Sequence, residues 1–236
     1  MTDADRALYA NHRRFLEAQR GALTPCDGFD VIHGDVPAFQ IAMLHEAAVA
    51  GRARERAAFV FAPPWADPGA DVFAGLAYRL THMSLPASVA QQPAAPQGLT
   101  IDRVADEAGL RAFTEAQAAG FAEPGDYGEL LAWMWDKNVR AFPLRGQSFY
   151  CLRRDGAVVS ILLTVDSGDA IGIYAVATPA ALRKQGLSSY LLARVCAAAP
   201  AGKMVCLQVM RGSDAERLYT KLGFVERFVV NVYKSR

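Results

Sequence analysis

The chain has 236 residues and a formal net charge of +1, with 52% hydrophobic and 21% charged residues. This composition excludes a globally disordered chain and allows one large domain or two of ordinary size. The near-neutral charge argues against a nucleic-acid-binding protein, which usually carries a basic excess or a basic stripe.

The sequence shows no targeting segment, disulfide framework or metal motif. Its N-terminal residues lack the apolar core of a signal peptide, and no stretch reaches the roughly 20 apolar residues of a membrane span. The four cysteines form no CxxC pair and the four histidines show no metal-site spacing. We therefore expect a cytoplasmic protein with buried free thiols, no metal, no membrane partner and no nucleic-acid partner. The oligomeric state stays open, with a homodimer as one option.

The first part of the chain shows elements but no catalytic spacing. Its patterns predict a helix over 4–20, a second helix over 38–57, a strand within 56–65 and a short helix over 71–80. The basic run "GRARER" at 51–56 fits a solvated helix face better than a nucleic-acid contact.

A composition shift at "LPASVAQQPAAPQG", residues 85–98, predicts an interdomain linker with a boundary near residue 97. The second part then reads β-α-α-β-β-β-α-β-α-β, which predicts an α/β domain with a mixed sheet and helices on its faces. The expected elements are a strand at 99–106, a helix to 119, a helix at 126–140, three strands within 148–178, a helix at 184–198, a strand at 203–209, a helix around 215–222 and a last strand at 227–234. Asp155-Gly156 predicts a tight hairpin turn. Strand 170–177, helix 184–198 and strand 203–209 should form a right-handed βαβ unit with parallel strands.

The corner at "ATPAALRKQGLSS", residues 177–189, is unusual for a strand-to-helix joint. The first turn of a helix presents unpaired N–H groups and a partial positive charge, which suit a phosphate group. Gly186 would let an anion approach the backbone, Ser188 adds a hydroxyl, and Arg183 and Lys184 add charge. The spacing R-x-x-G-x-S therefore predicts a pyrophosphate-binding loop, against the alternative of a basic helix start with a glycine placed by chance. The chain has neither G-x-x-x-x-G-K-[ST] nor a G-x-G-x-x-G after a strand, so a P-loop or dinucleotide site is not expected.

A second pattern, "SDAERLYTKLGF" at 213–224, places Tyr219 on the apolar side of a helix that Gly223 closes. A tyrosine there can simply pack against the core, or its phenol can serve chemistry at a neighbouring site.

Taken together, the two patterns resemble the GCN5-related N-acetyltransferases (GNAT family). "RKQGLS" matches the family's pyrophosphate loop [RQ]-x-x-G-x-[GA] except at Ser188, and "AERLYTKLGF" matches A-x-x-L-Y-x-K-L-G-F at every fixed position. The resemblance covers about 99–236 and implies a catalytic domain at 98–236. Residues 1–97 look like the degenerate leading half of tandem members, because they contain no pyrophosphate loop.

The resemblance implies acetyl-CoA, or another acyl-CoA, as donor and a small-molecule or peptide amine as acceptor. It implies that the backbone of Val176, Ala177 and Thr178 pairs with the pantetheine arm. A β-bulge near there would aim an N–H at the thioester oxygen and stabilise the tetrahedral intermediate. Tyr219 would protonate the departing sulfur. The backbone N–H groups that would hold the pyrophosphate are those of Arg183, Lys184, Gln185, Gly186, Leu187 and Ser188.

The sequence departs from the family at two points. Strand "AIGIYAVAT" lacks the glutamate that many relatives use as a base, and Gly212-Ser213 stands where an asparagine is common. No base is assigned, and a catalytically silent acyl-CoA-binding sensor or scaffold is the alternative function. The residues that would flank the acceptor groove are Asp126, Tyr127, Glu129, Trp133, Trp135 and Asp136. The three carboxylates are expected on solvated helix faces and the two tryptophans in the core.

Overall fold

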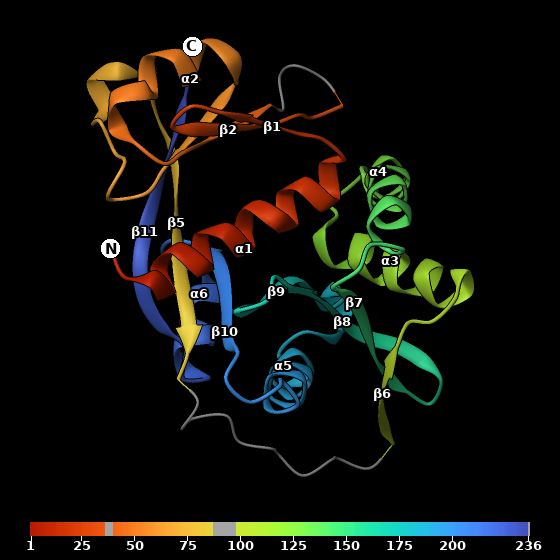
Figure 1. Cartoon of the computed structure of the whole chain (residues 1–236). Helices are drawn as coiled ribbons and strands as arrows, with labels where there is room; N and C mark the ends of the chain where they lie inside the picture. The colour runs from red at the N-terminus through yellow and green to blue at the C-terminus, as the bar shows by residue number, and fades with distance from the viewer. Residues whose placement is uncertain (36–39, 87–97, 236) are drawn as a thin grey trace. The chain divides into compact units, whose positions relative to one another are not determined.

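The computed structural model describes residues 1–35, 40–86 and 98–235. It contains two compact units, one of Met1–Ser84 with Cys206–Arg236 and the other of Leu85–Val205 (Figure 1). Most of the predicted linker, including the boundary near residue 97, lies outside the described residues. The units are defined by packing, so the expectation of a degenerate acetyltransferase-like domain at 1–97 stays a prediction.

In its described residues, the first unit consists of a sheet with three α-helices. Its strands follow the order β1-β2-β3-β4-β11-β5-β10, with β3 and β4 parallel. Its elements are α1 (Asp3–Arg20), β1 (Leu23–Cys26), β2 (Phe29–Ile32), β3 (Ile41–Leu44), α2 (Ala50–Arg56), β4 (Phe59–Ala62), β5 (Gly75–Leu85), the greater part of β10 (Met204–Met210), α6 (Asp214–Lys221) and β11 (Val225–Lys234).

Strand β11 explains why the C-terminal residues lie in the same unit as the N-terminal residues. It pairs antiparallel with β4 on one side and with β5 on the other. Its Tyr233 is buried and stacks on Phe73 with ring centroids 4.6 Å apart. The C-terminal strand thus completes the hydrophobic core of the first unit.

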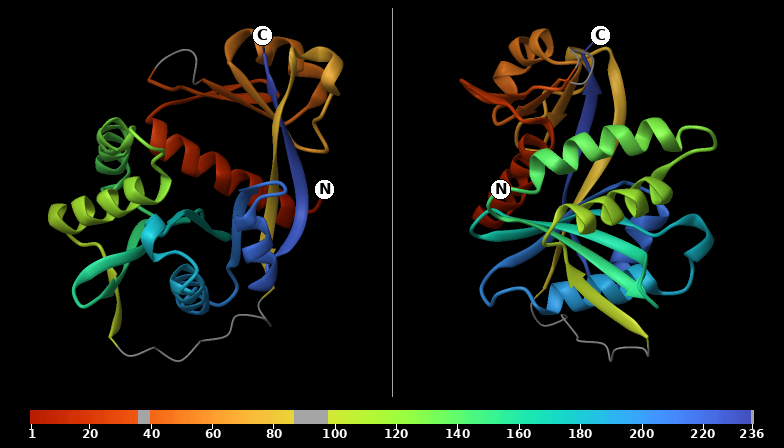
Figure 2. Two further views of the ribbon diagram at one scale, coloured as in Figure 1. Left: turned by 180° about the vertical axis from the view of Figure 1, so that it is seen from behind. Right: turned by 90° about the vertical axis from the view of Figure 1, so that its right-hand side faces the viewer.

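The described part of the second unit is a four-stranded antiparallel meander with helices on both faces. Its strands follow the order β9-β8-β7-β6, and α3 and α4 lie on one face while α5 lies on the other (Figure 2). Phe113 of α3 meets Phe149 of β7 edge to face at 5.0 Å, and both are fully buried. The elements are β6 (Leu99–Arg103), α3 (Glu107–Phe121), α4 (Tyr127–Ala141), β7 (Gln147–Arg154), β8 (Ala157–Asp166), β9 (Ala170–Ala177) and α5 (Leu187–Ala197).

The predicted order of elements in the second part of the chain is confirmed. The Asp155-Gly156 turn joins β7 to β8 with both residues at positive φ, 50° and 84°, as a tight hairpin of this kind requires. Gly223 follows α6 at φ 92°, the left-handed conformation expected at the end of a helix. No helix in the described part of the chain is long and apolar enough to cross a bilayer.

Two helix predictions in the first part of the chain are wrong. Within 38–57, Ile41–Leu44 is a strand and only Ala50–Arg56 is α-helical. All four residues of this strand are buried, and a short apolar run buried on both faces has no periodicity that separates strand from helix. Within 71–80, a 3-10 turn over Ala70–Val72 gives way to β5, because β11 pairs along the length of this segment.

Candidate functional site

Strand β9 is irregular at its end. Its pairing with β8 runs from Leu163↔Tyr174 to Ile161↔Ala177, so β9 has one more residue than β8 between these pairs. Ala175, inside this interval, has φ +50°, which a residue with a side chain rarely adopts. This is the β-bulge that was expected near Val176–Thr178, and it turns one peptide out of the regular ladder.

Side chains of β8 hold the end of β9 in place. The Ser160 hydroxyl donates to the carbonyl of Ala177 at 3.0 Å and also lies 3.0 Å from the Thr178 hydroxyl oxygen. Ser160 is fully buried, so its hydrogen bond to Ala177 O is shielded from water. Pro179 follows directly, and its missing N–H ends the strand.

The loop after Pro179 makes two left-handed turns. A short 3-10 helix spans Ala180–Leu182, Arg183 is extended, and Lys184 and Gly186 have φ +63° and +75°. A Cβ placed on Gly186 would find no atom within 4 Å, so the backbone faces open space there. Successive N–H groups in alternating conformations of this kind form a concave anion-binding surface.

Helix α5 begins without a cap. Gly186 occupies its N-cap position with no side-chain hydrogen bond, and the first hydrogen bond of the helix runs from the Tyr190 N–H to Gly186 O at 2.9 Å. Among the residues that the structure describes, none accepts a hydrogen bond from the N–H groups of Lys184 to Ser189. Such a helix start is suited to bind a phosphate group.

The basic and polar side chains of the loop have different surroundings. Arg183 Nη2 donates to Gly120 O at 2.6 Å and its Nε to Thr178 O at 3.3 Å. Gln185 Oε1 accepts from Arg154 at 3.0 Å. Lys184 is exposed and has no ion pair within the described part of the chain. Arg183 therefore braces the loop, and Lys184 is the cation available to a ligand.

Gly120 is a residue that sequence reasoning missed. It lies in the last turn of α3, and a Cβ there would stand 2.7 Å from the Cβ of Ala177 and 3.3 Å from the Thr178 nitrogen. A helix can approach the end of β9 this closely only at a glycine. The sequence does contain a signal for this contact, because a glycine inside a helical pattern, as at Gly120, often marks close packing.

Tyr219 lies in the other unit, on α6. It is 8% exposed, and its ring centroid is 5.9 Å from that of Phe224. Burial raises the pKa of its phenol to about 12. The predicted meeting of Tyr219 with the loop around Gly186 concerns the two units together and stays a prediction.

The residues suggested to flank an acceptor groove lie on α4 or at its start. One oxygen of Asp126 is buried with no partner in the described chain, Glu129 is exposed, and Asp136 pairs with Arg140. Tyr127, at the start of the helix, is 42% exposed.

The expectation that both tryptophans pack in the core is wrong for Trp133, which is 53% exposed. The buried face of α4 consists of Met134, Lys137, Asn138 and Ala141, and Trp133 lies outside it. Trp135 is half-buried, with the Arg111 guanidinium 4.6 Å from its ring centroid.

The fold and this loop together define a class of protein. The structure is similar to a GCN5-related N-acetyltransferase from Kribbella flavida, with a TM-score of 0.73, 16% identity and coverage of 99% of this chain and 96% of that one. It is also similar to a putative GNAT-family acetyltransferase from Novosphingobium aromaticivorans, with a TM-score of 0.56, 18% identity and coverage of 91% and 92%. A tandem GNAT protein from the clavulanic acid biosynthesis pathway gives a TM-score of 0.57 at 14% identity, with coverage of 100% and 96%. These likenesses establish an acetyltransferase-type fold.

The family follows from the sequence itself. Residues 90–218, more than half of the chain, match the family model described as the acetyltransferase (GNAT) domain. The chain therefore belongs to the GNAT family, whose acyl donor is acetyl-CoA. A search of the curated proteins gives no match. Within the described residues, no group of three or more histidine, cysteine, aspartate or glutamate side chains is placed to hold a metal ion.

Proposed function

We propose that this protein is an acetyl-CoA-dependent N-acetyltransferase in which an acceptor amine attacks the thioester directly. The observation that carries the proposal is the open start of α5, where the N–H groups of Lys184 to Ser189 have no acceptor in the described chain. A chain can match the family and still be unable to bind the acyl donor. The start of α5 supports binding, because it presents backbone N–H groups without an acceptor, and a diphosphate binds to such groups.

The loop fits the diphosphate of CoA in its shape and its charge. Gly186 leaves room for an anion against the backbone, and the exposed Lys184 supplies a cation. The N–H groups from Arg183 to Ser188 would hold the diphosphate, although that of Arg183 also donates to Ala180 O at 3.3 Å. Ser188, which replaces the small residue usual in the family's loop, is partly exposed and would add a hydroxyl donor.

The bulge in β9 would serve the thioester. Ala175 at φ +50° turns the backbone next to Val176, and Ser160 fixes the strand just beyond it. A peptide N–H held in this way can donate to the oxygen that becomes negative during acyl transfer. The backbone of Val176, Ala177 and Thr178 would pair with the pantetheine arm.

Tyr219 would act on the departing sulfur. Because burial raises its pKa to about 12, the phenol stays protonated at neutral pH, which is the state that an acid requires. The same high pKa makes it a weak acid toward a thiolate, whose own pKa is ordinarily about 8.5. We therefore expect Tyr219 to donate a hydrogen bond that strengthens as charge builds on the sulfur.

Strand β9 carries no carboxylate, so we assign no general base to the protein. The attacking amine must be neutral, and water is the proton acceptor that the proposal requires. The acceptor is a small-molecule or peptide amine.

The test is CoA release from acetyl-CoA in the presence of a panel of small amines and peptide N-termini. We expect amine-dependent turnover, with a reduction of at least tenfold in kcat for Tyr219→Phe and an unchanged affinity for acetyl-CoA. Tyr78→Phe, which removes another phenol from the first unit, should keep full turnover. Acetyl-CoA binding with no transfer to any amine would contradict the proposal and favour an acyl-CoA sensor.

A further inference from the structure

The helix that carries Tyr219 is joined to strand β5 through a glutamate. Glu216 lies three residues before Tyr219 on α6, and its two carboxylate oxygens accept hydrogen bonds from different parts of the chain. Oε1 accepts from the Thr81 hydroxyl of β5, and Oε2 accepts from the backbone N–H of Gly212 at 2.6 Å. All of these residues belong to the first unit, where β5 lies between β11 and β10 in the sheet (Figure 1). The start of α6 is therefore tied to a residue 135 positions earlier in the chain.

This arrangement differs from an ordinary helix cap. Ser213 is the N-cap of α6, and its hydroxyl accepts from the Glu216 N–H at 3.2 Å. In a capping box the glutamate would in return accept from the N-cap N–H. Here the Ser213 N–H donates to Met210 O, and the Glu216 carboxylate bonds to Gly212 and Thr81 instead. The carboxylate thus fixes the turn before α6 and joins that turn to β5.

The bond between Thr81 and Glu216 joins a buried hydroxyl to a charged group. Thr81 is 0% exposed, so loss of this acceptor would leave a polar group in the interior at a cost. The hydrogen bond from Thr81 is the first cause that lowers the pKa of Glu216, so the carboxylate is ionised at neutral pH. Hydrogen bonds to an ionised acceptor are stronger than those between neutral groups. The tie is therefore expected to hold α6 firmly.

The other end of α6 is closed by its own backbone. The Phe224 N–H donates to Tyr219 O and the Gly223 N–H donates to Thr220 O, both at 3.0 Å. These bonds are local and join α6 to no other element. Because the helix has only eight residues, a shift of its start also moves Tyr219, which lies about one turn further on.

We infer that Thr81 and Glu216 are positioning residues for the phenol of Tyr219. The inference rests on the proposed role of Tyr219 in acetyl transfer, and neither residue touches the reacting atoms. It gives the N-terminal part of the chain a task in catalysis, because β5 supplies the hydroxyl that holds α6. Small displacements matter at such a site, since a shift of about 1 Å can lower a rate about a hundredfold.

The test is a double-mutant cycle on kcat, measured as CoA release with the amine that gives the highest wild-type rate. Thr81→Val keeps the shape of the side chain and removes the hydroxyl. We expect kcat to fall about tenfold, with the KM for acetyl-CoA within twofold of wild type. In the Tyr219→Phe background the same change should have no further effect, because no phenol is left to place. Glu216→Gln, which keeps one acceptor oxygen, should retain more activity than Glu216→Ala.

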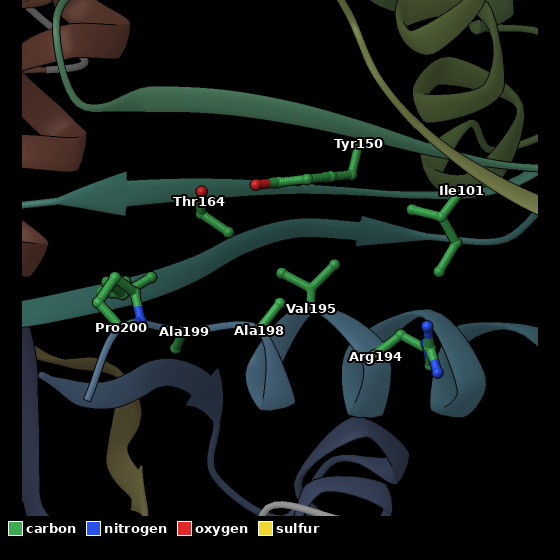
Figure 3. Close-up of a pocket in the computed structure, with 9 residues that line it drawn as sticks. Ile101, Tyr150, Thr164, Arg194, Val195, Ala198, Ala199 and Pro200 are labelled. Atoms are coloured by element: carbon green, nitrogen blue, oxygen red, sulfur yellow. The ribbon is translucent and has the colours of Figure 1, made fainter. Parts of the chain in front are cut away.

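Two other threonines serve as matched controls. Thr220→Val removes an exposed hydroxyl that donates to Glu216 O within α6, and it should leave kcat unchanged. Thr164→Val changes a buried strand residue of the second unit, where Thr164 lines a hollow of about 250 Å³ between the sheet and the end of α5 (Figure 3). Any loss of kcat in Thr164→Val should be the same in the wild-type and Tyr219→Phe backgrounds.

Amide hydrogen exchange separates a lost tie from general unfolding. Thr81→Val should speed exchange in residues 212–221 and leave exchange in Glu107–Phe121 unchanged. Unchanged exchange in residues 212–221 would overturn the inference, as would wild-type kcat in Thr81→Val or an equal fall in kcat with and without the Tyr219 phenol. Failure of the wild type to acetylate any amine would instead contradict the proposed function, and hydrogen exchange would still decide whether Thr81 holds α6.

Discussion

The guanidinium of Arg183 donates a hydrogen bond of 2.6 Å to the backbone carbonyl of Gly120, 63 residues earlier in the chain. The same side chain donates to Thr178 O at 3.3 Å. One residue thus ties the end of α3 and the end of β9 to the loop before α5. The loop is held by a side chain that donates to carbonyl groups, and the backbone N–H groups of Lys184 to Ser189 have no acceptor among the described residues.

Arg183→Ala should lower stability more than Lys184→Ala does. Loss of two hydrogen bonds from a charged donor should cost about 1 kcal/mol in the free energy of unfolding, because the side chain is partly solvated. Lys184→Ala removes an exposed cation with no partner in the described chain, so it should leave stability unchanged and weaken CoA binding, more so at low salt. Urea unfolding and calorimetric titration measure the two effects. A stable Arg183→Ala together with a destabilised Lys184→Ala would show that the Arg183 side chain does not hold the loop.

Gly120→Ala should destabilise the protein by about 1–3 kcal/mol, although alanine is the better helix former. The added Cβ would stand 2.7 Å from that of Ala177, and backbone lies just behind it. Gly128→Ala is the matched control, because Gly128 also lies in a helix and a Cβ there meets nothing within 4 Å. The control should be stabilised by up to about 1 kcal/mol. Equal effects at the two positions in thermal unfolding would rule out the close approach of α3 to β9.

These residues also show how far the sequence alone leads. The spacing of Arg183, Gly186 and Ser188 predicts the loop because the conformation of a helix start is local. The element order of the second part follows for the same reason, since its hairpins join neighbours in the chain. The contact between Arg183 and Gly120 joins residues far apart in sequence, and no local pattern indicates it.

The first part of the chain was harder to predict because its strands depend on distant partners. Strand β5 pairs with β11, which lies more than 100 residues away, and this pairing overrides the helical pattern at 71–80. The hairpin of β1 and β2 was missed, although Asp27-Gly28 is a strong turn signal and Gly28 has φ +80°.

Two buried histidines should make the first unit sensitive to acid. His12 and His82 are 5% and 0% exposed, with ring centroids 5.2 Å apart. Burial lowers the pKa of His12 to about 3, and burial followed by the charge of His12 lowers the pKa of His82 well below its usual value. In the unfolded chain both take up protons near pH 6.5. Between about pH 6.5 and 3 the unfolded state therefore binds more protons, and stability falls as the pH falls.

The measurement is the free energy of unfolding in urea at pH 8 and pH 5. The loss should be at most about 2 kcal/mol for each histidine. His82→Leu should reduce that loss, whereas His33→Gln, at a partly exposed histidine, should keep it. A pH dependence that is the same in wild type and His82→Leu would show that the buried ring does not cause the loss.

The central claim, that the backbone at the start of α5 binds the diphosphate of acetyl-CoA, is tested most directly by calorimetric titration of Gly186→Glu with CoA. Gly202→Glu is the matched control, because Gly202 also has a positive φ, 84° against 75°, and a Cβ there also meets nothing within 4 Å. Both variants place a side chain on a backbone of positive φ and add the same new charge. We expect CoA binding to weaken by at least a hundredfold in Gly186→Glu and to stay within twofold of wild type in Gly202→Glu. Wild-type affinity in Gly186→Glu would contradict the claim.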